Sequence, residues 1–219
     1  MLLLQFSTSH YCRKARLALG FKKLEFAVEN LTPGKHIFKL KPLTGLTTVP
    51  VLLPEKPGEP KAIADSTRIF QYLEQYAPQP SFYPKEPTQA NLLEDWLDES
   101  IGTATRYVYY DFRANAGKNI DPSFSSQLVI NIVRYQYGIT PAAVELAKAR
   151  LKQGMEVLSI WKNQPYLVGE VLSIADITAA ALLSPLALIP EYRQDYPWLF
   201  NRIIEVHLLC GEPLPPGLA

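Results

Sequence analysis

Two side chains with reactive groups, Ser9 and Cys12, lie at the start of a predicted helix. Apolar residues recur at helical spacing over 12–21, after a short polar stretch, and this pattern indicates the helix. The first backbone N–H groups of a helix have no intrahelical partner, so they can stabilise an anion. Ser9 is placed to donate to such an anion, and a serine here also serves as an ordinary helix cap.

Two further pairs, Val49-Pro50 and Asp65-Ser66, stand next to predicted elements. A cis peptide bond before Pro50 would turn the Val49 backbone towards an extended peptide. Only about 5–6% of X–Pro bonds in folded proteins are cis, however, and this frequency favours a trans bond here. Ser66 can cap a helix and hold a carboxylate with its N–H, while Asp65 can accept from an ammonium. Together the second pair suits an amino-acid headgroup, with a simple helix cap as the alternative.

Strands and helices must position these residues, and the pattern of apolar residues in the first half of the chain predicts them. Strands are expected at 2–6, 24–28, 51–53 and 61–63, and helices at 12–21, 35–41 and 66–77. The resulting order, β-α-β-α-β-β-α, is typical of an α/β thioredoxin-like N-terminal domain.

The second half has helical spacing throughout and predicts an all-α helical bundle domain. Prolines at 78, 80, 84 and 87 cannot continue a helix, so we expect domains at 1–78 and 88–219 joined by a linker at 79–87. Helices are expected at 90–113, 126–137, 141–162, 174–188 and 198–210. The fourth is apolar almost all round, which predicts a buried helix whose start is capped structurally by Ser173 and Asp176.

Composition excludes several classes of function. The 219 residues carry a net charge of +1, which gives no electrostatic case for binding nucleic acid or a membrane. No apolar run reaches the length of a bilayer span. Two cysteines far apart indicate a reducing, cytoplasmic location, and the three histidines lack the spacing of metal ligands, so we expect no metal.

The motifs occur together in an order that resembles the cytosolic glutathione transferase superfamily over nearly the whole chain. Ser9-x-x-Cys12, Val49-Pro50, Asp65-Ser66, and Gly169 with Ser173-Ile174-Ala175-Asp176 stand where that family has its catalytic, cis-proline, γ-glutamyl-binding and capping motifs. The resemblance implies glutathione as co-substrate, a hydrophobic electrophile as second substrate, a role in detoxification, and a homodimer with Arg68 and Asp98 near its interface.

The resemblance also implies a role for each motif. Val49 would bond the cysteinyl backbone of glutathione, Asp65 and Ser66 would hold its γ-glutamyl group, and Ser9 would face the thiol. The alternatives for the thiol are Cys12, Tyr11, Ser7 and Arg13. The candidates for the glycyl carboxylate are Lys35, Lys39 and Lys41, since the loop 43–48 departs from the family pattern. Tyr107 and Tyr110 are the candidates for the electrophile pocket.

Three functions are compatible with these motifs. The first is a glutathione transferase that activates the thiol for attack on an electrophile. The second is a glutathione-dependent thiol reductase or dehydroascorbate-type enzyme that uses Cys12, although a cysteine one turn into a helix is usually less exposed than the residue at its start. The third is a non-catalytic binding or scaffold protein, because a fold does not fix an activity.

Segment 121–137 looks like a helix that is inserted relative to the family pattern.

Overall fold

The N-terminal part of the computed structural model, which describes residues 1–83 and 87–219, is a four-stranded sheet with three helices. Its elements are β1 (Leu2–Gln5), α1 (His10–Phe21), β2 (Ala27–Asn30), α2 (His36–Thr44), β3 (Val51–Leu53), β4 (Ile63–Ala64) and α3 (Ser66–Tyr76). The order of strands and helices along the chain is the one that the sequence predicts, and the fold is the thioredoxin-like domain followed by helices.

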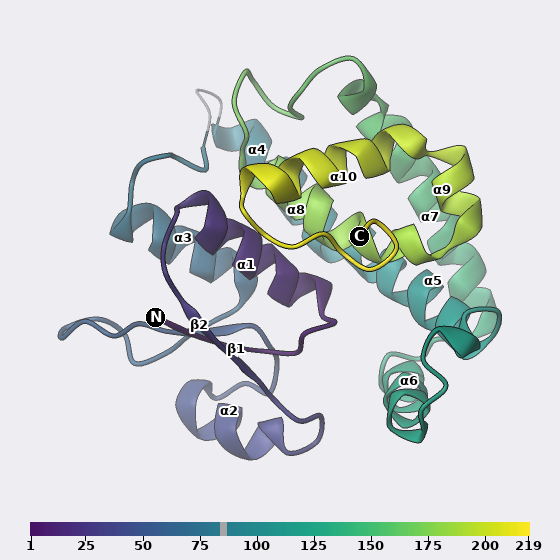
Figure 1. Cartoon of the computed structure of the whole chain (residues 1–219), viewed down its shortest axis with the longest axis horizontal. Coiled ribbons are helices and arrows are strands. Elements are labelled where there is room, and N and C mark those ends of the chain that lie inside the picture. Colours follow the sequence, from purple (N-terminus) through teal and green to yellow (C-terminus); the bar gives the residue numbers. More distant parts are fainter. Residues whose placement is uncertain (84–86) are drawn as a thin grey trace.

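The sheet is mixed, with strand order β2-β1-β3-β4. The strand β1 pairs parallel with β2 and antiparallel with β3, and β3 pairs antiparallel with β4. Alternating side chains of β1 face opposite layers: Leu3 packs with the core that includes α1 and α3, whereas Leu4 packs with Leu40 of α2. Figure 1 shows α1 and α3 on one side of the strands and α2 on the other.

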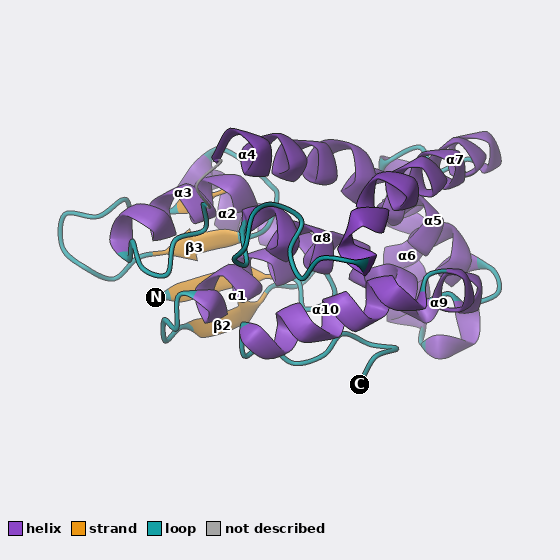
Figure 2. Cartoon of the chain, turned by 90° about the horizontal axis from the view of Figure 1, so that it is seen from above, coloured by secondary structure: helices purple, strands orange, loops and turns teal. Residues whose placement is uncertain are grey.

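The rest of the described chain is helical. Its α-helices are α4 (Pro87–Asp95), α5 (Gly102–Ala114), α6 (Phe124–Gln136), α7 (Pro141–Leu158), α8 (Ile174–Leu183), α9 (Pro190–Asp195) and α10 (Pro197–Leu209). A π-helical segment, Trp96–Ile101, joins α4 to α5, and short 3-10 segments follow at Lys118–Ile120, Ser159–Lys162 and Ser184–Leu188. Figure 2 shows the helices gathered beside the sheet domain, with α8 near the centre. No helix in the described ranges is long and apolar enough to cross a membrane.

The helix α8 is buried along its entire length, as its composition predicts, and it packs against α1 of the sheet domain. Its start is held by the Asp176 carboxylate, which accepts from Ser173 N–H at 2.9 Å and from Leu167 N–H at 2.7 Å. The Ser173 hydroxyl also donates to this carboxylate, at 2.7 Å. These bonds fix both the first turn of α8 and the loop before it.

Several predicted boundaries were wrong. The second strand lies at Ala27–Asn30 rather than 24–28, because its register is set by pairing with β1. Helix α2 continues past Lys41 through Pro42 and ends where Gly45 adopts a left-handed φ of 75°. The single helix expected over 90–113 is interrupted by the π segment, and α9 was not foreseen. The boundaries of the predicted linker at 79–87 stay a prediction, and its residues 84–86, including Pro84, lie outside the described residues.

Candidate functional site

Strand register brings the three predicted binding segments to one end of the sheet. Leu4 of β1 pairs with Val51 of β3, and Val51 pairs with Ala64 of β4. The segment that leads into Ser9 follows β1, while Val49-Pro50 precedes β3 and Asp65-Ser66 follows β4. Because β1 and β4 end where β3 begins, the starts of α1 and α3 also lie at this end of the sheet.

Ser9 is the N-cap of α1, and its hydroxyl oxygen accepts from Cys12 N–H at 3.3 Å. The residue is half-buried, whereas Ser7 before it is exposed in a turn. Accepting one bond leaves the Ser9 hydroxyl hydrogen able to donate. An anion beside Ser9 would therefore meet a hydroxyl donor together with the positive end of α1.

The other candidates in this motif are directed elsewhere. Cys12 is fully buried, and burial raises the pKa of its thiol. The Tyr11 hydroxyl donates to the backbone carbonyl of Asp98 at 2.7 Å, and burial raises the pKa of Tyr11 to about 12. Arg13 is buried and donates to the Ser184 hydroxyl in the helical part. Ser9, by contrast, is half-buried, and its one hydrogen bond is the capping bond at the start of α1.

The peptide bond between Val49 and Pro50 is cis, as the resemblance implies. The low general frequency of cis X–Pro bonds had favoured trans. Asp65 has a φ of 82°, a left-handed value that is rare for residues other than glycine and is found often at functional sites. Its carboxylate caps α3 by accepting from Arg68 N–H at 3.1 Å. Ser66, the next residue, is buried.

The three lysines proposed for the glycyl carboxylate differ in their surroundings. Lys39 lies 2.5 Å from a carboxylate oxygen of Glu29, so its charge is already balanced by β2. Lys35 is the exposed N-cap residue of α2, and Lys41 is exposed in the last turn. Since β2 runs parallel to β1, the start of α2 follows the same end of the sheet, which favours Lys35 over the other two.

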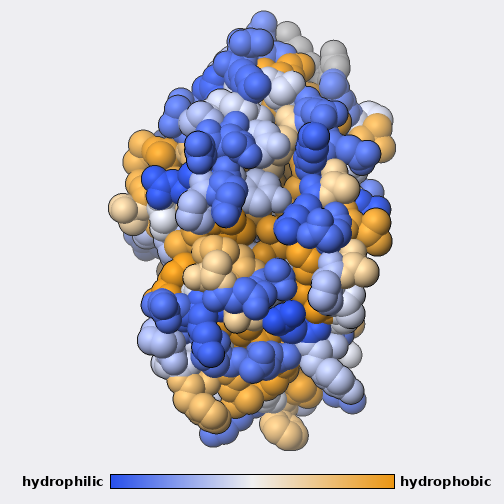
Figure 3. Space-filling model, turned by 90° about the vertical axis from the view of Figure 1, so that its right-hand side faces the viewer, coloured by the Kyte–Doolittle hydropathy of each residue, from blue (hydrophilic) through white to orange (hydrophobic). Residues whose placement is uncertain are grey.

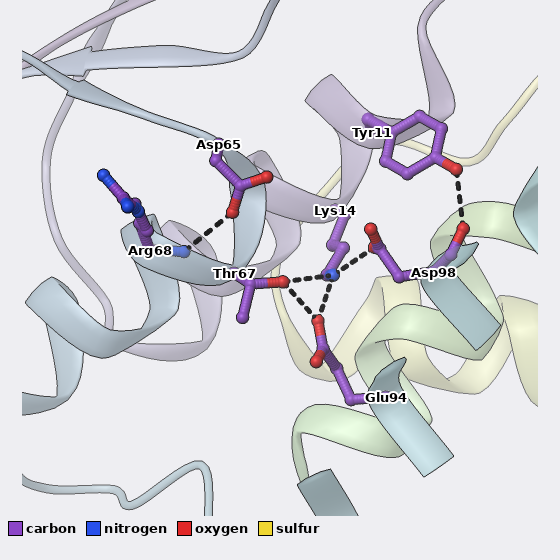
Figure 4. A network of polar contacts seen from close by, with 7 residues as sticks. All are labelled: Tyr11, Lys14, Asp65, Thr67, Arg68, Glu94 and Asp98. Carbon is purple, nitrogen blue, oxygen red and sulfur yellow. Dashed lines mark hydrogen bonds and ion pairs between the residues drawn. The ribbon is translucent and has the colours of Figure 1, made fainter. Parts of the chain in front are cut away.

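A buried ionic cluster that the sequence did not reveal lies beside this end of α3 (Figure 4). The ammonium of Lys14, fully buried on α1, lies 2.5 Å from Asp98 Oδ1 and also pairs with Glu94. The hydroxyl of Thr67 donates to Glu94 at 2.6 Å. The carboxylate of Asp98 thus binds a lysine of the same chain, and the expected places of Asp98 and Arg68 near a dimer interface stay predictions.

The π segment positions this contact with α1. The Gly102 N–H bonds to Leu97 O, five residues back, and the wide turn presents the Asp98 carbonyl to Tyr11. A Cβ atom on Gly102 would lie 2.9 Å from the Tyr11 hydroxyl and 2.9 Å from Leu182 Cδ1, so glycine here allows the start of α5 to lie close to α1 and α8.

Arg106 forms a second contact that sequence reasoning missed. Its guanidinium carbon lies 5.2 Å from the centroid of the Tyr11 ring and 4.3 Å from that of Tyr137, which follows α6. The sequence shows an arginine among tyrosines here but not which way each one faces. Tyr107 donates to Tyr137 O at 2.8 Å, and burial raises the pKa of Tyr110 to about 12.

A cavity of about 450 Å³ opens elsewhere, between α5, α7 and α9. Apolar side chains such as Val108, Phe112 and Ile189 line it together with charged side chains such as Asp111 and Lys152. Figure 3 shows the corresponding face, with an apolar hollow between hydrophilic side chains. None of the predicted site residues lines this cavity, so it is distinct from the end of the sheet. In the described ranges no three His, Cys, Asp or Glu side chains gather as a metal site.

Known proteins resemble this chain first of all in its sheet domain. Residues 3–81 match the family model described as "Glutathione S-transferase, N-terminal domain". No curated protein sequence matches the chain.

Three solved structures extend the similarity to the whole chain, each at 21% identity. A glutathione S-transferase from Methylobacterium radiotolerans, in complex with glutathione sulfonate, has a TM-score of 0.72 and covers 98% of this chain and 94% of its own. The beta-etherase LigF from Sphingobium sp. has a TM-score of 0.72, with 99% and 96% covered. FzlA from C. crescentus has a TM-score of 0.69, with 100% and 94% covered. Residues 3–81 therefore resemble a glutathione S-transferase N-terminal domain, and the whole chain has the same overall fold as these solved structures.

Proposed function

We propose that this protein is a glutathione transferase that binds glutathione at the end of the sheet where β3 begins. The observation that carries the proposal is the register that sets Ser9, Val49 and Asp65 at that one end. Glutathione is a peptide with a free amino-acid headgroup, a thiol and a second carboxylate. The three segments provide groups that suit these parts.

The start of α3 offers donors that suit the γ-glutamyl group. Within the described ranges, the N–H groups of Ser66 and Thr67 bond to no protein acceptor, and neither does the Ser66 hydroxyl. These donors suit the carboxylate of the headgroup, while the Asp65 carboxylate suits its ammonium. The left-handed backbone of Asp65 turns the chain between β4 and α3 at this point, which supports a functional reading of the strain.

The Val49 backbone supports the second part of the assignment. Neither its N–H nor its C=O bonds to a protein group among residues 1–83 and 87–219. An extended peptide laid along this edge would satisfy both groups, as in the addition of a strand to a sheet. We assign this role to the cysteinyl backbone of glutathione.

Ser9 would then stabilise the thiolate by donating its hydroxyl hydrogen, aided by the N-terminus of α1. The thiol proton leaves to solvent, the sulfur forms a bond to an electrophilic carbon, and the leaving group departs with the electron pair. The stack of Tyr11, Arg106 and Tyr137 begins at Tyr11, two residues after Ser9, and combines two aromatic rings with one cation. This surface suits an apolar electrophile that carries a polar or anionic leaving group.

The alternative functions have weaker support. A thiol reductase needs an accessible thiolate, whereas Cys12 is fully buried and burial raises the pKa of its thiol. A non-catalytic binding protein needs only the glutathione contacts, so it differs from our proposal in turnover and not in affinity. A cytoplasmic location and a role in detoxification belong to the proposal as well.

Asp65→Asn is expected to weaken glutathione binding about tenfold or more, because a hydrogen bond to a charged group contributes about 1.5–3 kcal/mol. Asparagine is an equally good helix cap, so stability should stay unchanged. Ser66→Ala should also weaken binding. Titration calorimetry with reduced glutathione measures both effects, and Asp121→Asn, which changes an exposed aspartate after α5, is the matched control. Equal affinities in all four proteins would exclude the γ-glutamyl assignment.

A further inference from the structure

The guanidinium of Arg106, on α5, lies over two aromatic rings. Its carbon is 5.2 Å from the centroid of the Tyr11 ring on α1 and 4.3 Å from that of the Tyr137 ring after α6. The rings attract the positive charge, but they do not replace the oxygen acceptors that its five N–H donors need. Among residues 1–83 and 87–219, no protein oxygen accepts a hydrogen bond from Arg106 and no carboxylate pairs with it.

Arg106 differs in this respect from the other arginines of the described chain that are sheltered from water. The buried or half-buried ones each donate to a protein oxygen: Arg13, Arg16, Arg113, Arg134 and Arg202. Arg106 is also half-buried. The remaining arginines are exposed, so water can bond to them. A half-buried guanidinium with free donors is the arrangement that a bound anion would complete.

The surroundings of Arg106 at the first turn of α1 favour negative charge. Arg13 is buried there and donates to a hydroxyl, not to a carboxylate. The carboxylate of Asp98 is already paired with Lys14. Burial, together with the charges of Arg106 and Arg13, holds the pKa of His10 well below its usual value, so His10 is neutral at pH 7. The positive potential at this turn therefore comes from guanidinium groups, which stay charged at every physiological pH, and from the N-terminus of the helix.

We infer that Arg106 binds a carboxylate on the second substrate, which is then an aromatic electrophile whose carboxylate stays on the ring after the reaction. The inference rests on the proposed function and names the substrate class of the same site. Two N–H groups of one guanidinium match the two oxygens of a carboxylate, so the pair would orient the substrate as well as attract it. The rings of Tyr11 and Tyr137 provide aromatic surface for the body of the substrate.

The position of Ser9 connects this anion site with the chemistry. Ser9 caps the helix whose first turn contains Tyr11, and the two residues are about 3 Å apart along the helix axis. The thiolate proposed at Ser9 and the carboxylate proposed at Arg106 therefore lie at the same end of α1. One small aromatic molecule would meet Arg106 with its carboxylate and the thiolate with its reacting carbon.

Two acceptors that differ in charge provide the first test: 4-chloro-3,5-dinitrobenzoate and its neutral amide. With either one the sulfur of glutathione bonds to the carbon that carries chlorine, chloride leaves with the electron pair, and the thiol proton goes to solvent. Each rate is divided by the uncatalysed rate, since the two rings differ in reactivity. Arg106→Gln should lower kcat/KM about tenfold or more for the carboxylate and less than about twofold for the amide, because only the carboxylate loses a charge-assisted bond.

Two further variants separate this role from a structural one. Arg106→Lys should lose part of the preference for the carboxylate, because lysine keeps the charge but not the planar fork. Arg150→Gln is the matched control for net charge, since Arg150 is exposed on α7, and it should leave both rates unchanged. If Arg106 only held Tyr137 in place, Arg106→Gln would slow both acceptors alike. That result, or an unchanged rate with the carboxylate, would overturn the inference.

Binding of a non-reacting acid separates the inference from the proposed function. Calorimetry compares 3,5-dinitrobenzoate with 3,5-dinitrobenzamide, neither of which has a leaving group. The parent should bind the acid about tenfold more tightly, and Arg106→Gln should remove this preference. If this preference were found but neither chlorinated acceptor reacted, the transferase function would fail and the anion site would stand. If both acceptors reacted but the parent bound acid and amide equally, the function would stand and the role of Arg106 would be wrong.

Discussion

Replacing Lys14 with methionine is expected to lower the free energy of unfolding by about 3–5 kcal/mol, the cost of breaking a buried ion pair by removing one partner. Lys14 is fully buried, and its ammonium pairs with Glu94 and Asp98. Methionine fills a similar volume but leaves the two carboxylates close together without a cation. Burial, with Glu94 nearby, already raises the pKa of Asp98 against the influence of Lys14.

The matched control for this change is Lys39→Met. Lys39 pairs with Glu29 at 2.5 Å, but both side chains are 41% exposed, so the loss should be about 0–1 kcal/mol. Urea denaturation of the parent and both variants measures the difference. Neutralising the carboxylates in Lys14→Met with Glu94→Gln and Asp98→Asn should restore part of the stability. Equal losses for the two lysines would show that burial does not strengthen this cluster.

Ser9→Ala is expected to slow glutathione conjugation about 25-fold at pH 7 with little change in affinity. A free thiol with a pKa near about 8.5 is only about 3% thiolate at this pH, whereas a pKa lowered by about two units makes roughly three quarters of it thiolate. Without the hydroxyl donor, the pKa of the bound thiol rises. The rate that is lost at pH 7 should therefore be recovered as the pH is raised towards about 9. Thiolate absorbance of bound glutathione against pH measures the shift.

Three variants separate this role from helix capping. Ser9→Thr keeps the hydroxyl and should conjugate at close to the parent rate. Ser123→Ala removes a serine cap of the same kind from α6, where Ser126 N–H bonds to Ser123 at 3.3 Å, and should leave turnover unchanged. Cys12→Ala should leave the rate of conjugation largely unchanged, because the Cys12 thiol is buried. If Cys12→Ala abolished turnover while Ser9→Ala did not, the thiol-reductase function would replace the one proposed.

The element order of the sheet domain could be predicted because each element has a local signature. A short apolar run marks Val51–Leu53, and the polar turn after it marks the hairpin to Ile63–Ala64. The boundaries that failed depend on distant partners. The start of β2 is set by pairing with β1, and the π segment at Trp96–Ile101 accompanies the approach of Tyr11 from α1. Helical periodicity in a single sequence carries no trace of either contact.

The residues of the candidate site likewise divide into those with a local signature in the sequence and those that depend on distant partners. Ser9 could be found because a residue that precedes a helix has a recognisable type, and it is the N-cap of α1. The cap of α3 was expected at Ser66 and lies one residue earlier, at Asp65. Lys14 could not be found, because a lysine on an amphipathic helix normally extends into solvent and only Glu94 and Asp98, some eighty residues later, explain its burial. Arg106 was hidden for the same reason, since its aromatic partners come from α1 and from the segment after α6.

The Lys14 cluster also has a consequence for recombination between proteins of this fold. Its cation comes from α1, while its two carboxylates come from α4 and the π segment. A chimera that joins the sheet domain of this chain to the helices of another protein must therefore carry acidic residues at the positions of Glu94 and Asp98, or exchange Lys14 as well. The sheet domain and the helices can therefore be exchanged between two such proteins only if the residues at these three positions remain compatible.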